Sequence, residues 1–522
     1  MHLAESSDGG SGRRFARLAW PAVFLALLLC GAAWAVAAPY NAPPDEAEHV
    51  ARAVGVARGE VFSRATTAGM GTGAYQTVPE SLIRPVCFQM QSHRTAACQP
   101  EPGGDATLTE VVTRAGRYNP VYYAVVGWPL RFWPDWTGVL LARLLTAAMV
   151  AGLLTGALHS ALKWTAHGGM LAGVLVATTP LLFHLAGSVN PAGVEIAAGI
   201  ALFAAGIPLL LNRPARLDPV LMRRVGVAAV TLATLRSLGP LWLALALGVL
   251  LLPTSRALVR ELWRSVRARV WAVVVAAGVV AGAAWTVGMH AATLITMGVD
   301  VTFGQAVKHE AISRWPAYVE QMVGRMSYDD TPLPSLSYLA WYAAVGSLLF
   351  TALAFARWVD RWRLLAIAAA TFAVPTLSDA VSVQRFGYAS QGRYMLPLAV
   401  GLPLLAAYLL STRGDVPLGA RRIGSLTRTL AVTLLPIHLV ALCTAMVRWQ
   451  RGLPQNSAFT PLNPLRGAWQ PVLGPEVPLL AMVAGIALLL VCCWRATRAR
   501  TDDAVSTAPL ARDEREPVPT GA

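Results

Sequence analysis

Residues 17–50 read RLAWPAVFLALLLCGAAWAVAAPYNAPPDEAEHV, a long apolar run followed directly by an acidic segment. No charged residue occurs between Leu18 and Ala38, and about 20 apolar residues suffice for a helix to cross the hydrocarbon core of a bilayer. Pro43 and Pro44 then end the helix, because proline lacks the backbone donor that a continuing helix needs. The stretch therefore predicts a membrane-spanning helix with charged groups just beyond its end.

Similar apolar runs recur through the whole chain of 522 residues. Apolar residues make up 55% of it and charged residues 14%, with a mean hydropathy of +0.50, whereas a soluble domain carries about 25% charged residues. This composition excludes a cytoplasmic globular enzyme, a disordered protein and a small disulfide scaffold. We predict an all-α polytopic membrane protein with about twelve transmembrane helices. The expected spans are residues 17–38, 137–161, 168–188, 191–211, 222–238, 240–253, 271–293, 335–356, 364–381, 393–411, 429–449 and 475–494.

The positive charge of the chain is spread along it. The net charge is +15 with an isoelectric point near 10.1, and 41 of the 43 basic residues are arginine because the only lysines are Lys163 and Lys308. Short loops rich in arginine next to membrane spans face the cytoplasm. Such loops are residues 13–17, 213–224, 256–269, 357–363, 413–428 and 495–500. The spread of charge argues against nucleic acid as a partner, since that would need a continuous basic patch.

The same rule places both termini in the cytoplasm. The loops at about 39–136 and 294–334 mix acidic and basic residues nearly evenly and are expected on the outer side. We expect a cytoplasmic tail at 1–16, a transmembrane domain at 17–494 and a disordered cytoplasmic tail at 495–522.

Cysteine usage agrees with an outer loop in an oxidising compartment. Cys87 and Cys98 are the only cysteines in the long outer loop, and there they are expected to form a disulfide. The remaining cysteines lie in apolar spans, where a buried thiol acts as a small apolar group. They are Cys30, Cys443, Cys492 and Cys493.

The acidic segment after the first span predicts an amphipathic helix lying on the membrane surface, starting near Pro44. Apolar residues recur at helical spacing in 50–61, while Asp45 and His49 project from another side. Asp45 and Glu46 would meet the positive end of the helix dipole, which favours their ionised form. An ionised carboxylate held there can accept a proton from a hydroxyl. The alternative is ordinary helix capping by acids.

A second polar cluster is expected on the same outer side. Residues 117–123 read RYNPVYY and precede several tryptophans. Tyr122 and Tyr123 are candidate substrate contacts. The alternative is an aromatic belt at the outer interface of the membrane.

A third cluster lies at residues 384–394, which read QRFGYASQGRY. Its arginines run against the positive-inside bias, so an anionic partner would explain them. A guanidinium suits bidentate binding of a phosphate, and the alternative is snorkelling to lipid headgroups. The candidate substrate contacts here are Gln391, Arg393 and Tyr394.

Charged residues inside a membrane are costly and often mark function. Glu195 is expected about one turn into a span that Asn190 opens as a cap, and Arg236 lies next to the Gly239-Pro240 break. Arg236 is expected to pair with Glu195 or to face a phosphate. In the second outer loop, we expect an exposed helical face for His309, Glu310 and Arg314. Asp329 and Asp330 are expected to be solvated loop acids, and the alternative is a metal or sugar contact.

The chain lacks the motifs of nucleotide-driven chemistry. It contains no Walker motif, no GxGxxG and no HExxH. An outward-facing site without a nucleotide-binding element favours a donor that is already carried on a lipid.

The order of short motifs along the chain resembles the domain of unknown function 2142 family of bacterial membrane proteins, over about residues 15–495. The resemblance rests first on PPDEAEH at 43–49. Further landmarks are NPVYY at 119–123, SVNP at 188–191, TPLP at 331–334 and QGRY at 391–394. The chain departs from the usual pattern at Asn119, where His or Pro commonly precedes the proline, and at Ala192, where Asp often stands.

That family is similar to the GT-C glycosyltransferases, which use polyprenyl-phosphate sugars as donors. The resemblance implies a GT-C-like fold and a sugar transfer to a hydroxyl of an envelope glycan, lipid or protein on the outer face. Asp45 would be the general base, and Glu46 would assist it or hold a divalent cation such as Mg²⁺ or Mn²⁺, a requirement that the sequence leaves open. The expected substrate-binding residues are His49, Tyr122, Tyr123, Asn190, Arg236, Gln391, Arg393 and Tyr394.

Two other functions stay open at this point. A lipid-linked glycan transporter or flippase would carry polar residues through the membrane midplane, and a non-catalytic protein of envelope assembly would tolerate loss of Asp45. For each of the three functions, we expect the chain in the cell membrane of a bacterium.

Overall fold

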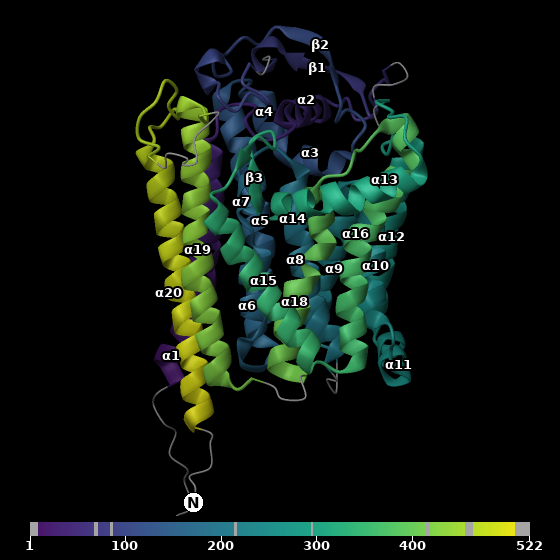
Figure 1. Cartoon of the computed structure of the whole chain (residues 1–522), viewed down its shortest axis with the longest axis vertical. Coiled ribbons are helices and arrows are strands. Elements are labelled where there is room, and N and C mark those ends of the chain that lie inside the picture. The colour runs from purple at the N-terminus through teal and green to yellow at the C-terminus, as the bar shows by residue number, and fades with distance from the viewer. Residues whose placement is uncertain are drawn as a thin grey trace, which may run out of the picture.

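The chain folds into a bundle of membrane-length helices that is covered at one end by a small layer of helices and strands (Figure 1). The structure is a computed structural model that describes residues 9–506 except 67–70, 84–86, 213–216, 294–295, 414–417 and 455–462. Several predicted features lie outside the described residues, namely tail segments 1–8 and 507–522 and Arg213 and Arg216.

The bundle is formed by apolar helices that run roughly along one axis (Figure 1). They are α1 (Gly9–Ala37), α5 (Trp136–Lys163), α6 (Met170–Ala177), α7 (Pro180–Ala186), α8 (Pro191–Leu211), α9 (Pro219–Leu235), α10 (Gly239–Leu251), α12 (Val266–Gly288), α15 (Ser335–Phe355), α16 (Trp358–Phe386), α17 (Gly392–Ala399), α18 (Gly401–Tyr408), α19 (Ala420–Arg451) and α20 (Glu476–Ser506). Short η3 (Ala166–Gly168) precedes α6, α11 (Arg256–Arg264) precedes α12, and η5 (Leu409–Arg413) ends α18.

The protein is a multi-pass membrane protein, but the predicted number of about twelve spans is not confirmed. Within the described ranges, nine helices are long and apolar enough to cross a membrane, or ten if the bent pair α6 and α7 forms one span. That pair bends by 67° at Thr178–Pro180, where proline opens the second helix. The predicted segments near Gly239 are helical but short, since α9 ends at Leu235 and α10 has 13 residues.

The outer layer comes from the two predicted long loops. The first loop forms α2 (Glu46–Ala57), β1 (Ala74–Pro79), η1 (Glu80–Leu82), η2 (Ala96–Cys98), β2 (Leu108–Thr113), α3 (Pro120–Val126) and α4 (Trp128–Phe132). The second loop forms α13 (Phe303–His309), η4 (Glu310–Arg314), α14 (Trp315–Gly324), β3 (Arg325–Met326) and β4 (Thr331–Pro332). β1 pairs antiparallel with β2 from Ala74 opposite Thr113 to Pro79 opposite Leu108, and β3 pairs with β4.

Helix α2 lies at the end of the bundle, where protein instead of lipid covers its predicted apolar face (Figure 1). It begins at Glu46 instead of Pro44, and both its apolar side and its polar side are buried, including Val50 and Arg52. The guanidinium of Arg52 donates to the backbone carbonyls of Tyr118, Glu60 and Val61. Packing beneath the β1–β2 hairpin therefore replaces the lipid contact that the amphipathic pattern suggested.

The predicted disulfide forms between Cys87 and Cys98. Its loop is fastened to the bundle by Arg448 of α19, which donates to the carbonyl oxygens of Phe88 and Arg94. Arg448 also pairs with Asp330 at 2.8 Å, so Asp330 is not the solvated loop acid that was predicted.

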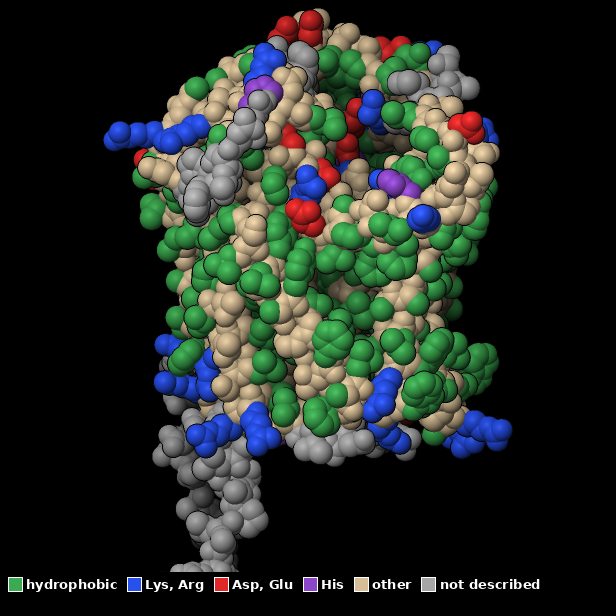
Figure 2. All heavy atoms as spheres, in the orientation of Figure 1, with side chains coloured by type: hydrophobic (Ala, Val, Ile, Leu, Met, Phe, Trp, Pro, Cys, Tyr) green, Lys and Arg blue, Asp and Glu red, His purple; other side chains and the backbone are tan. Residues whose placement is uncertain are grey.

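The charge asymmetry expected from the sequence is visible on the face drawn in Figure 2. Hydrophobic side chains cover the middle of the bundle, Lys and Arg gather at the end from which α1 starts, and acidic side chains lie near the other end. Helix α1 already begins at Gly9 and α20 continues to Ser506, so both helices extend past the boundaries expected for the transmembrane domain. Residues 495–506 belong to α20, and the cytoplasmic position of both tails stays a prediction.

Candidate active site

A cavity of about 610 Å³ opens at the end of the bundle that carries the outer layer. Its wall combines the start of α2, the segment before α3, the start of α8, the α9–α10 break, and the segment between α16 and α17. Asp45, Asn190, Arg236, Gln391 and Arg393 all contribute to this wall. With His49 and Tyr394, which also line the cavity, the fold thus brings together seven of the predicted site residues from distant parts of the sequence.

Asp45 and Arg393 form an ion pair in the cavity. Asp45 is the residue before α2, yet its side chain makes no capping hydrogen bond. Its Oδ2 instead accepts from Nη2 of Arg393 at 2.6 Å. The side chain of Asp45 is 48% exposed, and the side chain of Arg393 is 9% exposed. The alternative of ordinary helix capping by Asp45 is therefore wrong, and its carboxylate is directed into the cavity.

The local backbone explains how the two groups meet. Asp45 has φ of 60°, a left-handed conformation that Asp and Asn adopt more readily than most residues. Gly392 begins α17 against α14, where an added Cβ would collide with the Tyr318 carbonyl, and its N–H donates to the Gln321 side chain at 2.7 Å. This close approach fixes the turn of α17 that carries Arg393.

The ionisation of Asp45 follows from its surroundings. Burial raises the pKa of this carboxyl, but the attraction of the nearby cations, Arg393 first and Arg236 after it, outweighs burial and holds the pKa below its ordinary value. Burial also lowers the pKa of His49 to about 3, so its imidazole is neutral at physiological pH. The Nδ1 of His49 lies 2.8 Å from the hydroxyl of Tyr123.

A second pair of opposite charges lies beside the first. Arg236, the residue that ends α9, lies 4.0 Å from the carboxylate of Glu195, so the predicted pairing is confirmed. Its guanidinium also lies 4.5 Å from the ring centre of Tyr394, a distance typical of a cation–π contact. Arg393 donates to the Tyr394 hydroxyl at 3.1 Å. Tyr394 therefore connects the two arginines.

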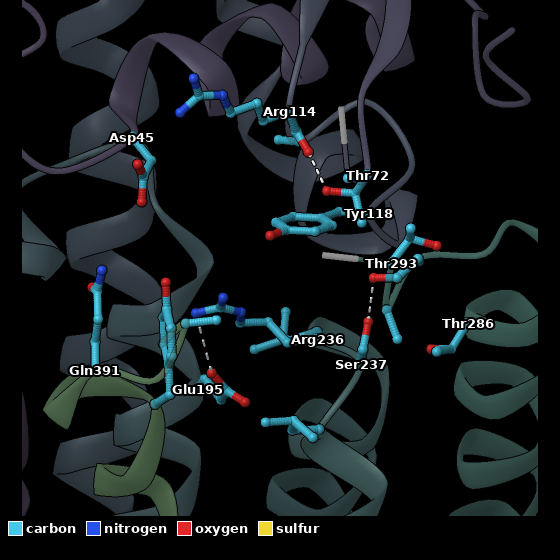
Figure 3. A pocket seen from close by; sticks show the side chains of 18 of the residues that line it. Asp45, Thr72, Arg114, Tyr118, Glu195, Arg236, Ser237, Thr286, Thr293 and Gln391 are labelled. Carbon is cyan, nitrogen blue, oxygen red and sulfur yellow. Dashed lines mark hydrogen bonds and ion pairs between the residues drawn. The ribbon is translucent and has the colours of Figure 1, made fainter. Parts of the chain in front are cut away.

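The opposite wall of the cavity carries hydroxyl groups. Figure 3 shows Asp45, Gln391, Glu195 and Arg236 on one side and Thr72, Ser237, Thr286 and Thr293 on the other, with Tyr118 between them. The Ser237 hydroxyl donates to Ala291 O at 2.7 Å and the Thr286 hydroxyl to Gly282 O at 2.9 Å. Their oxygen lone pairs remain able to accept from the hydroxyls of a ligand.

A family model covers most of this architecture. The model described as predicted membrane protein (DUF2142) matches residues 28–402. The chain belongs to the DUF2142 family. Asp45, Glu195, Arg236 and Arg393 all lie within the DUF2142 region.

Solved structures of similar shape belong to ArnT from Cupriavidus metallidurans. The structure described as bound to undecaprenyl phosphate is 14% identical, with a TM-score of 0.43 over 96% of this chain and 80% of that chain. The apo structure is 14% identical, with a TM-score of 0.44 over 95% of this chain and 80% of that chain. No curated protein matches the chain.

Within the DUF2142 region, Glu46 does not have the predicted catalytic place. It is fully buried, and both its oxygens accept from Arg143 of α5. It also accepts from the backbone N–H groups of Asn41 and Val189. Because all these contacts hold the carboxylate inside the protein, Glu46 stabilises the fold and is no longer a candidate catalytic group.

A divalent cation does not fit the acids that the structure brings together. Glu46 is saturated by Arg143, and the nearest charged partner of Asp45 is Arg393. In the described part of the chain, no group of three or more His, Cys, Asp or Glu side chains is arranged to hold a metal. The wall of the cavity carries the carboxylates of Asp45, Glu48, Glu195 and Asp379 and the guanidiniums of Arg114, Arg236 and Arg393. Asp45 and Glu195 are each paired with an arginine, and the guanidiniums of these pairs suit an anionic ligand.

The tyrosine pair also differs from the prediction. Tyr122 and Tyr123 are buried behind the cavity instead of lining it, and the hydroxyl of Tyr122 lies 2.9 Å from that of Thr146. Tyr118, four residues earlier than Tyr122, lines the cavity. The aromatic spacing signalled a site, but only the fold shows which ring faces it.

Contacts from the second outer loop were also missed from the sequence. Glu310 is fully buried and pairs with Arg314 at 2.7 Å, so the exposed position predicted for Glu310 is wrong, whereas His309 is exposed as predicted. Arg314 donates to the carbonyl of Ser390 at 2.5 Å, and the Ser390 hydroxyl donates to Asp379 at 2.9 Å. These contacts fix the segment that precedes Gln391. No sequence pattern pointed to them, because they join three separate elements.

Proposed function

We propose that the chain is a membrane glycosyltransferase of GT-C type that moves a sugar from a polyprenyl-phosphate donor to a hydroxyl on the outer face. The observation that carries the proposal is the meeting of Asp45 with Arg393, which are 348 positions apart in sequence and 2.6 Å apart in space. A carboxylate able to take a proton and a guanidinium able to hold a phosphate therefore share one cavity. The acceptor would be an envelope glycan, a lipid or a protein.

The size of the cavity supports a sugar-sized ligand. Sites for small molecules commonly enclose about 300–1,000 Å³, and the cavity measures about 610 Å³. Its hydroxyl wall, which includes Ser237 and Thr286, offers acceptors for the hydroxyls of a sugar. The rings of Tyr118 and Trp285 also line the cavity and offer apolar faces to the ligand.

In the proposed reaction, Asp45 accepts the proton of the acceptor hydroxyl. The acceptor oxygen then forms a bond to the anomeric carbon while the bond from that carbon to the phosphate oxygen breaks. The electron pair of the broken bond stays on the phosphate, so the leaving polyprenyl phosphate gains one negative charge. Attack from the face opposite the phosphate inverts the anomeric centre.

Arg393 and Arg236 would stabilise the charge that grows on the leaving phosphate. Both guanidiniums lie at the cavity and are linked by Tyr394. Preorganised cations that face developing charge lower the barrier more than contacts made equally in the ground state. Arg236 lies 4.0 Å from Glu195, which is farther than the 2.6 Å between Asp45 and Arg393. This looser pairing leaves the guanidinium of Arg236 able to bind a phosphate and supports its proposed role.

Two other predicted residues act as positioning groups in this proposal. Asn190 caps α8 by accepting from Ala192 N–H, and its amide donates to the Pro44 carbonyl at 3.0 Å. It thereby holds the residue next to Asp45. Neutral His49 contacts Tyr123 and presents no competing charge to the phosphate.

The experiment compares the full chain with Asp45→Asn in sugar transfer from polyprenyl-phosphate sugars to candidate acceptors. Asn tolerates the left-handed conformation of this position, so the variant should fold. We expect transfer to fall by about 10²–10⁴-fold, the usual contribution of a positioned base. Glu110→Gln is the matched control, because Glu110 pairs with Arg64 on the exposed surface and its loss should leave transfer unchanged.

The same experiment addresses the other functions considered from the sequence. A flippase would move lipid-linked glycan across vesicles without forming a new glycosidic bond. A scaffold protein would show no transfer with any donor, and its role would survive Asp45→Asn. Full transfer activity in Asp45→Asn would remove Asp45 as the base.

A further inference from the structure

The ion pair between Asp45 and Arg393 uses only part of the guanidinium. Asp45 engages Nη2 through one oxygen, Oδ2. The Nε of Arg393 is buried and has no hydrogen-bond partner among the described residues. A buried N–H without a partner is unfavourable, so this edge of the guanidinium is suited to an additional acceptor from a ligand.

A phosphate can use this edge better than Asp45 does. The two unesterified oxygens of a phosphodiester match a pair of guanidinium N–H groups in a bidentate contact. Such a contact would satisfy Nε and would take over Nη2, the nitrogen that now binds Asp45. Phosphate and carboxylate therefore compete for the same atom of Arg393.

Asp45 is the partner that can give way. It precedes α2 without a capping bond, and its side chain is 48% exposed in the cavity. Glu195, which pairs with Arg236, is 2% exposed and lies inside α8. The other charged or titratable side chains that line the cavity are Glu48 and His49 of α2, Arg114 after β2, Tyr118 before α3, Asp379 of α16, Tyr388 after α16 and Tyr394 of α17.

We propose that binding of the donor activates the base. The donor phosphate displaces Asp45 from Arg393, and only the displaced carboxylate of Asp45 accepts the proton of the acceptor hydroxyl. This inference rests on the proposed function and adds what decides when Asp45 can act. A glycoside without a phosphate leaves the pair closed, so the pair determines specificity for phosphate-bearing donors. Arg393 thus has a different partner before and after donor binding.

The test measures the affinity of the full-length protein in phosphatidylcholine nanodiscs for farnesyl phosphate, with farnesol as the probe that lacks the phosphate. If carboxylate and phosphate compete, Asp45→Asn should bind farnesyl phosphate about tenfold more tightly, or about 1.4 kcal/mol, and farnesol equally. Glu110→Gln is the control for general removal of negative charge. Glu110 pairs with Arg64 on the exposed surface, and its variant should change affinity less than about twofold, as expected for a charge without direct contact.

A double-variant cycle locates the competition at Arg393. Arg393→Gln should weaken binding, and Asp45→Asn added to it should give no further gain, since coupled residues do not act additively. Weaker or unchanged binding by Asp45→Asn overturns the inference while leaving the proposed function intact. A failure of every variant to bind farnesyl phosphate overturns both the donor class and the inference.

Discussion

Asp45 illustrates how much chemistry depends on one backbone conformation. Its φ of 60° turns the side chain away from the N–H groups of α2 and toward Arg393. A carboxylate in the usual extended conformation of an N-cap would instead accept from the helix. The carboxylate of Asp45 is therefore available in the cavity because it does not cap α2, the role that its position before the helix suggests.

The first prediction concerns the pH dependence of transfer. The acid limb of the pH profile of kcat/KM reports a pKa of the free enzyme, and the acid limb of the kcat profile reports a pKa of the enzyme–substrate complex. In the free enzyme, burial raises the pKa of Asp45 but Arg393 outweighs it, so the limb of kcat/KM should lie below the ordinary pKa of an aspartate. If donor phosphate draws Arg393 away, the limb of kcat should lie at higher pH. Coincident limbs in the two profiles would contradict the exchange of partners.

The second prediction concerns His49. Because burial lowers its pKa to about 3, His49 does not titrate near pH 6.5. We expect His49→Gln to keep the shape of the pH profile while lowering kcat severalfold through the lost contact to Tyr123. Disappearance of a limb near pH 6.5 in this variant would assign His49 a proton-transfer role instead.

The third prediction concerns the stability of the outer layer. Burial raises the pKa of Glu101 from 4.5 to about 7, although Arg143 opposes it. The folded state therefore favours the protonated acid, and stability present below about pH 4.5 is lost as pH rises through about 7. Thermal unfolding in detergent should show this loss, of order 1–3 kcal/mol, and Glu101→Gln should remove it. If the stability of Glu101→Gln had the same pH dependence as that of the native protein, the assignment of this effect to Glu101 would be refuted.

At the scale of elements, the end of α1 depends on a side chain from another helix. Arg143 of α5 donates to the carbonyl oxygens of Ala35, Ala38 and Pro39, which the end of a helix leaves without partners. Glu46 neutralises the same guanidinium. This cluster joins α1, α2 and α5 and explains why an acid next to Asp45 has a structural role.

The fourth prediction separates those neighbouring acids. Glu46→Gln leaves the charge of Arg143 buried without a counter-ion and should destabilise the fold by about 3–5 kcal/mol. Asp45→Asn should change the melting temperature little, because this position is half-exposed and the amide oxygen of Asn can still accept from Arg393. Adding Arg143→Met to Glu46→Gln should recover part of the stability. A stable but inactive Glu46→Gln protein would instead restore the catalytic role predicted from the sequence.

At the scale of the whole molecule, apolar helices with arginine at one end and mixed charges at the other define an oriented membrane protein (Figure 2). The cavity and the disulfide both belong to the end with mixed charges. We propose that this end faces outward in the cell membrane of a bacterium and that both termini are cytoplasmic, since arginine-rich loops remain on the cytoplasmic side.

The fifth prediction tests that orientation. In intact spheroplasts, a tag at either terminus should be protected from added protease, and Cys87 and Cys98 should resist a membrane-impermeant thiol reagent until a reductant is added. A protease site inserted in the outer layer is the control for access. Cleavage of terminal tags in sealed spheroplasts would reverse the proposed topology.

The sequence by itself determined the membrane class, most of the helical segments, the disulfide and most of the polar clusters at the end of the bundle that carries the cavity. Those features follow from local composition and periodicity, which need no knowledge of distant contacts. It also indicated Asp45, Arg236 and Arg393 as candidate site residues, because charged groups near a membrane are costly and therefore informative.

Only the tertiary structure decided which of these groups face one another. Glu46 and Asp45 are adjacent in sequence, yet one is buried against Arg143 and the other is directed into the cavity toward Arg393. Tyr118 and Tyr122 likewise share an aromatic segment but not a surface. The physical reason is that burial and pairing of charge depend on side chains contributed by other helices, and their position in space is fixed by packing, which no local pattern records.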